Sequence, residues 1–154
     1  MTRLAWQLTP TDGVAVVIVS GSVDEDADFA ALARDIAPHK QLRLDLSDID
    51  RINSCGVREW VNFIRAVPDS NSIELVRCSP AFVSQINMIS NFTGSARVVS
   101  VEAPYVCDAC GCEKRVVYEV GSGRQPELPA VPCPECSVEM EFDDIEDSYF
   151  AFLS

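Results

Sequence analysis

Two Cys-x-x-Cys motifs near the C-terminus constrain the fold of this chain more than any other feature of its 154 residues. They span residues 107–110 and 133–136, with 22 residues between them. Two residues between cysteines let the chain turn so that both sulfurs face one ion, and two such turns complete a tetrahedral sulfur shell. The spacing therefore predicts a zinc site with four ligands, Cys107, Cys110, Cys133 and Cys136.

The segment that carries these motifs has the composition of a small module. From about residue 103 the helical periodicity of the preceding chain stops, and glycines and prolines indicate loops. Residues 116–118 and 140–142 are candidates for the short strands that bring the two motifs together. A module with so little core depends on metal for its folding free energy. We interpret residues 103–142 as a zinc ribbon with a structural ion, because four thiolates leave no open position for a catalytic water.

A fifth thiol, Cys112, lies two residues beyond the first motif. The spacing favours Cys110 as the ligand and leaves Cys112 as a neighbour or an occasional substitute. Two other interpretations of the motifs are a set of thiols without a metal and a thioredoxin-like redox pair. The redox pair is the weaker of the two, because neither motif sits at a strand-to-helix junction.

Charge and hydrophobicity narrow the class of protein. Hydrophobic residues make up 47% of the chain, which predicts a packed core. The formal net charge is −12 and no three Lys or Arg residues cluster, so direct binding to nucleic acid is disfavoured. No apolar stretch approaches the roughly 20 residues of a membrane span, and the N-terminus lacks a signal-peptide pattern. We expect a cytoplasmic protein without a membrane partner, whose cysteines are metal ligands and free thiols.

The first hundred residues alternate strand and helix patterns. Apolar and alternating runs predict strands at 4–8, 14–19, 42–46, 73–76 and 98–101. Helices are expected after three capping signals, which are Ser22 with Glu25, Asn53 or Ser54, and Ser79 before Pro80. The resulting order, β-β-α-β-α-β-α-β, predicts an α/β domain over residues 1–102.

Three short motifs in this domain carry a family resemblance. Residues 44–56 contain a strand ending in Asp-Leu-Ser and then Asn-Ser-Cys-Gly at the expected start of a helix. Residues 21–24 read Gly-Ser-Val-Asp, and residues 75–80 form a strand followed by Ser-Pro. In order and spacing these motifs resemble the sulphate-transporter and anti-sigma-factor-antagonist (STAS) family over residues 5–102. The resemblance implies a mixed sheet with helices packed on it.

In the antagonists of that family, the Ser or Thr before the glycine is phosphorylated by a kinase that doubles as an anti-sigma factor, and phosphorylation releases the kinase. A helix N-terminus suits a phosphate because it exposes amide groups and the positive end of a dipole. This chain has Cys55 at that position and Asn53 in place of the motif's aspartate. Ser54 occupies the other place in the motif, where we expect it to cap the helix. The usual phospho-switch is therefore not expected.

Cys55 leaves several interpretations open. It is either a small, partly buried side chain that fits this corner, or a redox-sensitive thiol whose pKa the helix N-terminus lowers. Metal-based or covalent catalysis is the weakest interpretation, because the only histidine, His39, belongs to a separate loop.

These observations lead to one hypothesis for function and two alternatives. We expect a non-enzymatic bacterial regulatory protein that binds a protein partner through the loop Asn53, Ser54, Cys55, Gly56 and Val57. The resemblance suggests an anti-sigma-type kinase, or a scaffold with similar domains, as that partner. The zinc ribbon would extend the surface, and residues 143–154 form an acidic and aromatic tail. The alternatives are a zinc-ribbon adaptor linked to transcription or nucleic-acid machinery, and a thiol-based redox sensor.

Overall fold

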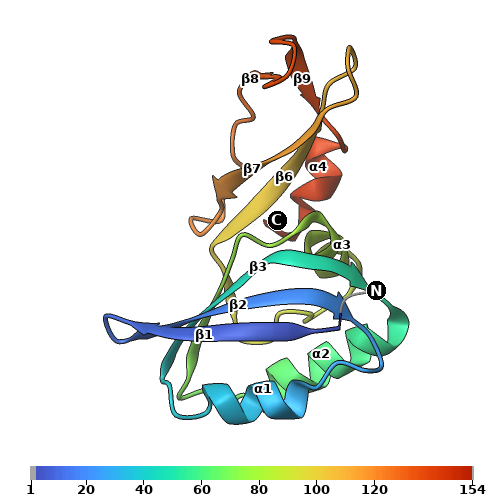
Figure 1. The fold of residues 1–154 in the computed structure, drawn as a ribbon. Coiled ribbons are helices and arrows are strands. Elements are labelled where there is room, and N and C mark those ends of the chain that lie inside the picture. The colour runs from blue at the N-terminus through green and yellow to red at the C-terminus, as the bar shows by residue number, and fades with distance from the viewer. Residues whose placement is uncertain (1–2, 154) are drawn as a thin grey trace.

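The chain begins with a five-stranded mixed sheet in the computed structural model, which describes residues 3–153 (Figure 1). β1 (Ala5–Thr11) and β2 (Val14–Val23) form an antiparallel hairpin, closed by Asp12 and Gly13 with φ angles of 50° and 83°. The other strands run parallel to β2 in the order β1-β2-β3-β4-β5, and they are β3 (Gln41–Ile52), β4 (Ser72–Val76) and β5 (Arg97–Val98). The predicted α/β class with a mixed sheet is confirmed.

Three helices share a hydrophobic core with this sheet, namely α1 (Phe29–Ile36), α2 (Ser54–Ala66) and α3 (Pro80–Met88). Trp60 lies at the centre of the core, where its ring packs against four others with centroid separations of 5.1 to 6.0 Å, those of Phe29, Phe63, Phe82 and Phe92. The buried indole N–H donates to the carbonyl of Phe92 at 2.7 Å, so the ring is fixed by packing and by a hydrogen bond. Among the described residues, no helix has the length and apolar character needed to cross a membrane.

β3 carries the chain from the core to the start of α2. Its predicted alternation is confirmed, since Leu42, Leu44 and Leu46 are buried while Arg43 is exposed. The strand continues to Ile52, and its pairing with β2 shifts register near Ser20 and Gly21. The strand is therefore longer than the segment 42–46 that the alternation predicted. The extension brings the end of β3 directly to the N-cap of α2.

A second sheet stands on the side of the first sheet opposite α1 and α2 (Figure 1). Its order is β7-β6-β9-β8, made of β6 (Ser100–Val106), β7 (Glu113–Glu119), β8 (Val131–Pro132) and β9 (Glu139–Phe142). The strands expected around 116–118 and 140–142 are therefore present. The strand expected at 98–101 is divided between β5 and β6, and the domain boundary expected after residue 102 lies inside β6.

The two sheets are joined by hydrogen bonds and by the C-terminal segment. β6 forms a bridge to the chain after β4, where Cys78 donates to the carbonyl of Ser100 and accepts from the amide of Glu102. The chain ends in α4 (Glu146–Tyr149) and the short 3-10 helix η1 (Ala151–Leu153). Tyr149 and Phe150 are 4% and 2% exposed and belong to the core of the first sheet, so this tail is packed as well as acidic.

Candidate metal centre

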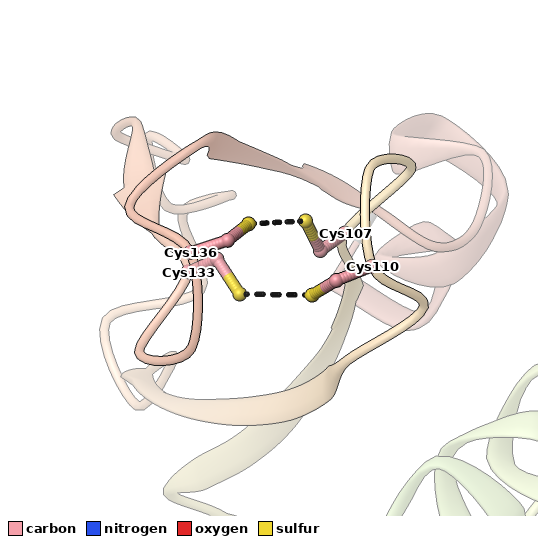
Figure 2. Close-up of side chains that lie close together, drawn as sticks. All are labelled: Cys107, Cys110, Cys133 and Cys136. Atoms are coloured by element: carbon pink, nitrogen blue, oxygen red, sulfur yellow. Dashed lines mark hydrogen bonds between the residues drawn. The ribbon is translucent and has the colours of Figure 1, made fainter.

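Four cysteine side chains converge at the far end of the second sheet (Figure 2). The Sγ atoms of Cys107 and Cys136 lie 3.5 Å apart, and so do those of Cys110 and Cys133. All four sulfurs lie within 4.8 Å of one another. Zn–S distances of about 2.3 Å in a tetrahedron place the sulfurs about 3.8 Å apart, so this arrangement fits a single tetrahedral ion. The structure thus brings together all four of the predicted ligands.

The two cysteine motifs are folded in the same way. In each, the amide four residues after the first cysteine donates to that cysteine's carbonyl, from Gly111 to Cys107 at 2.7 Å and from Ser137 to Cys133 at 2.9 Å. In each, the first cysteine donates to the carbonyl five residues on, that of Cys112 or Val138, at 2.8 Å. The residue after each second cysteine has a positive φ, 78° at Gly111 and 66° at Ser137. These backbone hydrogen bonds and φ angles give each motif a tight turn, and the turn directs both of its sulfurs toward the same point.

Backbone amides make one of the sulfurs a better ligand. Burial alone raises the pKa of the Cys133 thiol, but N–H groups of Glu135 and Cys136 point at its sulfur and lower the pKa below its usual value. The amide of Glu135 lies 3.4 Å from that sulfur. The amide of Cys112 favours a Cys110 thiolate, yet the hydrogen bond to Cys133 keeps Cys110 protonated and raises its pKa. The backbone thus favours the thiolate form of Cys133, which is the form of cysteine that binds a metal ion.

Apolar side chains enclose the inner pair of cysteines. Cys107 and Cys133 are 1% and 3% exposed, whereas Cys110 and Cys136 are exposed. The buried pair packs in a small cluster with Ala103, Tyr105, Val131 and Met140. The side of the site formed by Cys107 and Cys133 is therefore buried against the second sheet, and the side formed by Cys110 and Cys136 faces solvent. The motif spacing predicts the ligands, but nothing in the spacing identifies these packing residues.

The remaining three cysteines are not among the four that converge. Cys112 is half-buried and packs against the cluster that holds Cys107 and Cys133, so it is a neighbour of the site. Cys78 is fully buried, and burial raises the pKa of its thiol well above its usual range. Cys55 is half-buried at the start of α2.

The expected regulatory loop lies at the other end of the molecule, at the N-terminus of α2. Asn53 caps this helix, because its Oδ1 accepts from the amide of Gly56 at 2.8 Å, so the expectation that Ser54 is the cap is wrong. Asn53 also donates through Nδ2 to Glu25 at 3.0 Å. Asn53 and Ser54 are exposed, and Val57 is half-buried. The contact with Glu25 is a feature that the sequence did not indicate.

Gly56 has a structural role in this loop. A Cβ atom at this position would lie 1.9 Å from the carbonyl oxygen of Val23, at the end of β2. The helix therefore approaches the sheet edge so closely that only glycine fits. Gly56 is buried, so the accessible part of the loop consists of its neighbours.

No protein-family model matches this chain, and no curated protein matches it. The structure by itself establishes a mixed α/β fold with a C-terminal cluster of four cysteines that can hold a metal ion.

Proposed function

We propose that this chain is a non-enzymatic, cytoplasmic regulatory module of bacteria, which binds a protein partner through the exposed start of α2 and carries a structural zinc ribbon. The observation that carries the proposal is the corner between β3 and α2. The exposed Asn53 is held there by hydrogen bonds to Gly56 and Glu25, and its neighbour Ser54 is exposed as well. A rigid, exposed polar turn on a helix N-terminus is suited to recognition, because little conformational entropy is lost when a partner binds.

The fold supports a STAS-like interpretation of the first sheet. An antiparallel hairpin comes first, parallel strands follow, and α2 starts directly at the end of β3. Residues 53–56, which carry part of the family resemblance, form the N-cap and the first turn of α2. An anti-sigma-type kinase, or a scaffold built from similar domains, is therefore the first partner to test.

Two features support a module without the usual phospho-switch. Asn53 is uncharged and hydrogen-bonded, so this corner lacks the carboxylate of the family motif. Cys55 takes the place of the phosphorylated residue and is half-buried. We therefore expect one constant binding state, in which the partner is regulated by other means.

The charge of the C-terminal half favours a protein partner over nucleic acid. Residues 103–154 contain eleven acidic residues and three basic ones. A zinc ion with four thiolates adds a further charge of about −2. The phosphate backbone of nucleic acid would be repelled by this surface, whereas a basic protein surface would be attracted.

Metal analysis of the purified full chain tests the ion. We expect one zinc per chain, because a closed tetrahedral sulfur shell suits zinc, and iron in the same shell would be recognised by its visible absorption. Thiol labelling with mass spectrometry gives the ligands. With zinc bound, label should enter Cys55 and Cys112 only, since the ion protects the four ligands and burial protects Cys78. Rapid labelling of Cys107 and Cys133 in the loaded protein would contradict the assignment.

Affinity capture from the native cells tests the partner role. Recovery of a small kinase or a component of a sigma-factor pathway supports the proposal. Recovery of only polymerase, ribosomal or DNA-bound proteins favours the alternative, an adaptor that acts through the zinc ribbon. Because the C-terminal half of this chain is acidic, a polymerase or ribosomal protein recovered in this way is expected to bind it through a basic surface.

Two matched variants then locate the surface. Arg58 and Arg65 are both exposed on α2, but Arg58 lies one turn after Ser54 and Arg65 lies in the last turn. We expect Arg58→Glu to weaken capture of the partner at least tenfold and Arg65→Glu to leave it unchanged. Circular dichroism checks that both variants fold. Equal capture by both variants would remove the start of α2 from the interface.

A further inference from the structure

We propose that the four-cysteine centre and the C-terminal hook, residues 146–153, form one cooperative unit. Metal binding holds the hook against α3, and loss of the metal releases it. The inference rests on the proposed metal centre and is independent of the partner assigned above. Binding or loss of metal at the four-cysteine centre would then change the docking of the hook on the first sheet.

Phe142 is the joint between the metal centre and the hook. It is the last residue of β9 and pairs with Tyr105 of β6. Its ring centroid lies 5.9 Å from that of Tyr105, which packs in the cluster around the buried ligands Cys107 and Cys133. The position of the Phe142 ring is therefore coupled through Tyr105 to the packing around both cysteine motifs.

On its other side Phe142 contacts the hook. Its ring centroid lies 5.4 Å from Tyr149 and 6.2 Å from Phe150. The amide of Asp143, the next residue, donates to the carbonyl of Pro104 at 2.8 Å and fixes the direction in which the chain leaves β9. The position of the hook is thus set by the position of β9.

The backbone pairing of β9 is short. This strand pairs with only two residues of β6 and two of β8. Ladders this short are marginal on their own. A metal ion would bond Cys107, at the end of β6, to Cys133 and Cys136, which precede β9. Such a cross-link replaces a loose pairing by a fixed one, so the metal determines whether β9 stays in register.

The hook is held by the burial of Tyr149 and Phe150 in the core of the first sheet and by two hydrogen bonds. The hydroxyl of Tyr149 donates to the carbonyl of Glu102 at 2.5 Å, and Nδ2 of Asn87 on α3 donates to the carbonyl of Tyr149 at 2.9 Å. Oδ1 of Asn87 is buried and has no hydrogen-bond partner among residues 3–153, which opposes docking. A helix of four residues is also unstable alone. The constraint that β9 supplies therefore adds to the burial of Tyr149 and Phe150 in keeping the hook docked.

Amide hydrogen exchange on the full chain tests the coupling. The protein is compared with bound Zn²⁺ and after removal of Zn²⁺ by a chelator. We expect exchange of residues 146–153 to become at least tenfold faster without the metal, while β2 and β3 keep their protection. Unchanged protection of the hook in a protein that demonstrably binds zinc would overturn the coupling alone. Failure to bind zinc would instead overturn the metal centre.

Thermodynamic reciprocity provides a second measurement. If the metal strengthens docking, docking must strengthen metal binding by the same factor. We expect Tyr149→Ala to weaken Zn²⁺ affinity about tenfold, although Tyr149 is not a ligand. Ile145→Ala is the matched control, because Ile145 precedes the same helix and is 69% exposed. Equal affinities for the two variants would contradict the proposal.

Discussion

At the scale of single residues, Asn53 is notable because one side chain satisfies two partners. Its oxygen caps α2 and its amide nitrogen donates to Glu25. An aspartate would cap the helix as well, but it would face the Glu25 carboxylate without a proton to donate. The pKa of Glu25 is lowered chiefly by this hydrogen bond. Asparagine at this position therefore suits both the helix cap and the neighbouring carboxylate of Glu25.

The Asn53→Asp variant separates these two roles. We expect a lower urea midpoint at pH 7, because two carboxylates then face each other while the cap is retained. In the native chain the depressed pKa of Glu25 contributes stability above its unfolded pKa, which is lost as the pH falls through its folded pKa. In the variant the sign reverses, so stability should rise as the pH is lowered toward the carboxyl pKa values. Restoration of the midpoint by a second change, Glu25→Gln, provides the control.

Gly56→Ala tests the close approach of α2 to the sheet. The added methyl group would meet the backbone of Val23, which cannot move without disturbing β2. We expect a loss of about 3 kcal/mol in the free energy of unfolding, the upper range for forced overpacking. Gly121→Ala is the control, since the nearest atoms to its added Cβ lie 3.8 Å away. A loss of less than about 0.5 kcal/mol for Gly56→Ala, the size of a neutral surface change, would contradict the contact.

At the scale of elements, hydrophobic periodicity predicted the order of strands and helices because it records which face each element buries. Caps were less predictable. Ser22 and Glu25 have capping-box spacing, but β2 continues to Val23, and Ser22 is buried there with its hydroxyl on Asp50. α1 is capped instead by Asp28, which the spacing did not single out. Several Ser and Asp residues compete in this turn, and tertiary packing selects among them.

Asp28→Ala measures the cap that the structure uses. Oδ1 of Asp28 accepts from the amide of Ala31 at 3.0 Å. We expect the variant to lose about 1 kcal/mol in the free energy of unfolding, the usual cost of deleting a cap. Asp26→Ala is the comparison, because Asp26 lies in the same turn and is exposed. Equal losses from both variants, measured by urea denaturation, would show that general charge is responsible.

The metal ligands were the most predictable part of the site, and the hook was the least. Four cysteines at fixed spacing define a site because the ion itself requires their convergence. The packing of Tyr149 and Phe150 on α3 depends on contacts between residues far apart in the sequence, which periodicity within a segment of four residues does not reveal. From the sequence, the same segment was described only as part of an acidic and aromatic tail.

At the scale of the whole molecule, Glu102 joins the two sheets. Its side chain is 8% exposed and lies between Arg115 of β7, at 3.3 Å, and Arg77 after β4, at 3.6 Å. Arg77 also pairs with Asp45, and Arg115 donates to the carbonyl of Ser47. Both of these contacts are on β3. One nearly buried carboxylate thus organises two arginines that span the junction.

The chain contains a matched control for this junction. Glu74 also lies between two arginines, Arg43 at 3.1 Å and Arg97 at 2.7 Å, but it sits within the first sheet and is 25% exposed. We expect Glu102→Gln to lose about 2 kcal/mol in the free energy of unfolding, less than a fully buried pair because both arginines are about half exposed. Glu74→Gln should lose about 0.5 kcal/mol, as exposed pairs do.

Salt separates the two cases further, because ions screen exposed charges more than buried ones. Raising the salt concentration to about 1 M should remove the loss caused by Glu74→Gln and leave most of the loss caused by Glu102→Gln. Urea denaturation of both variants at low and high salt provides the four values. If both losses are equal and vanish together in salt, the junction is held by apolar packing of the hook, and Glu102 is only one more surface charge. If the Glu102 loss persists, the relative placement of the two sheets depends on this buried carboxylate.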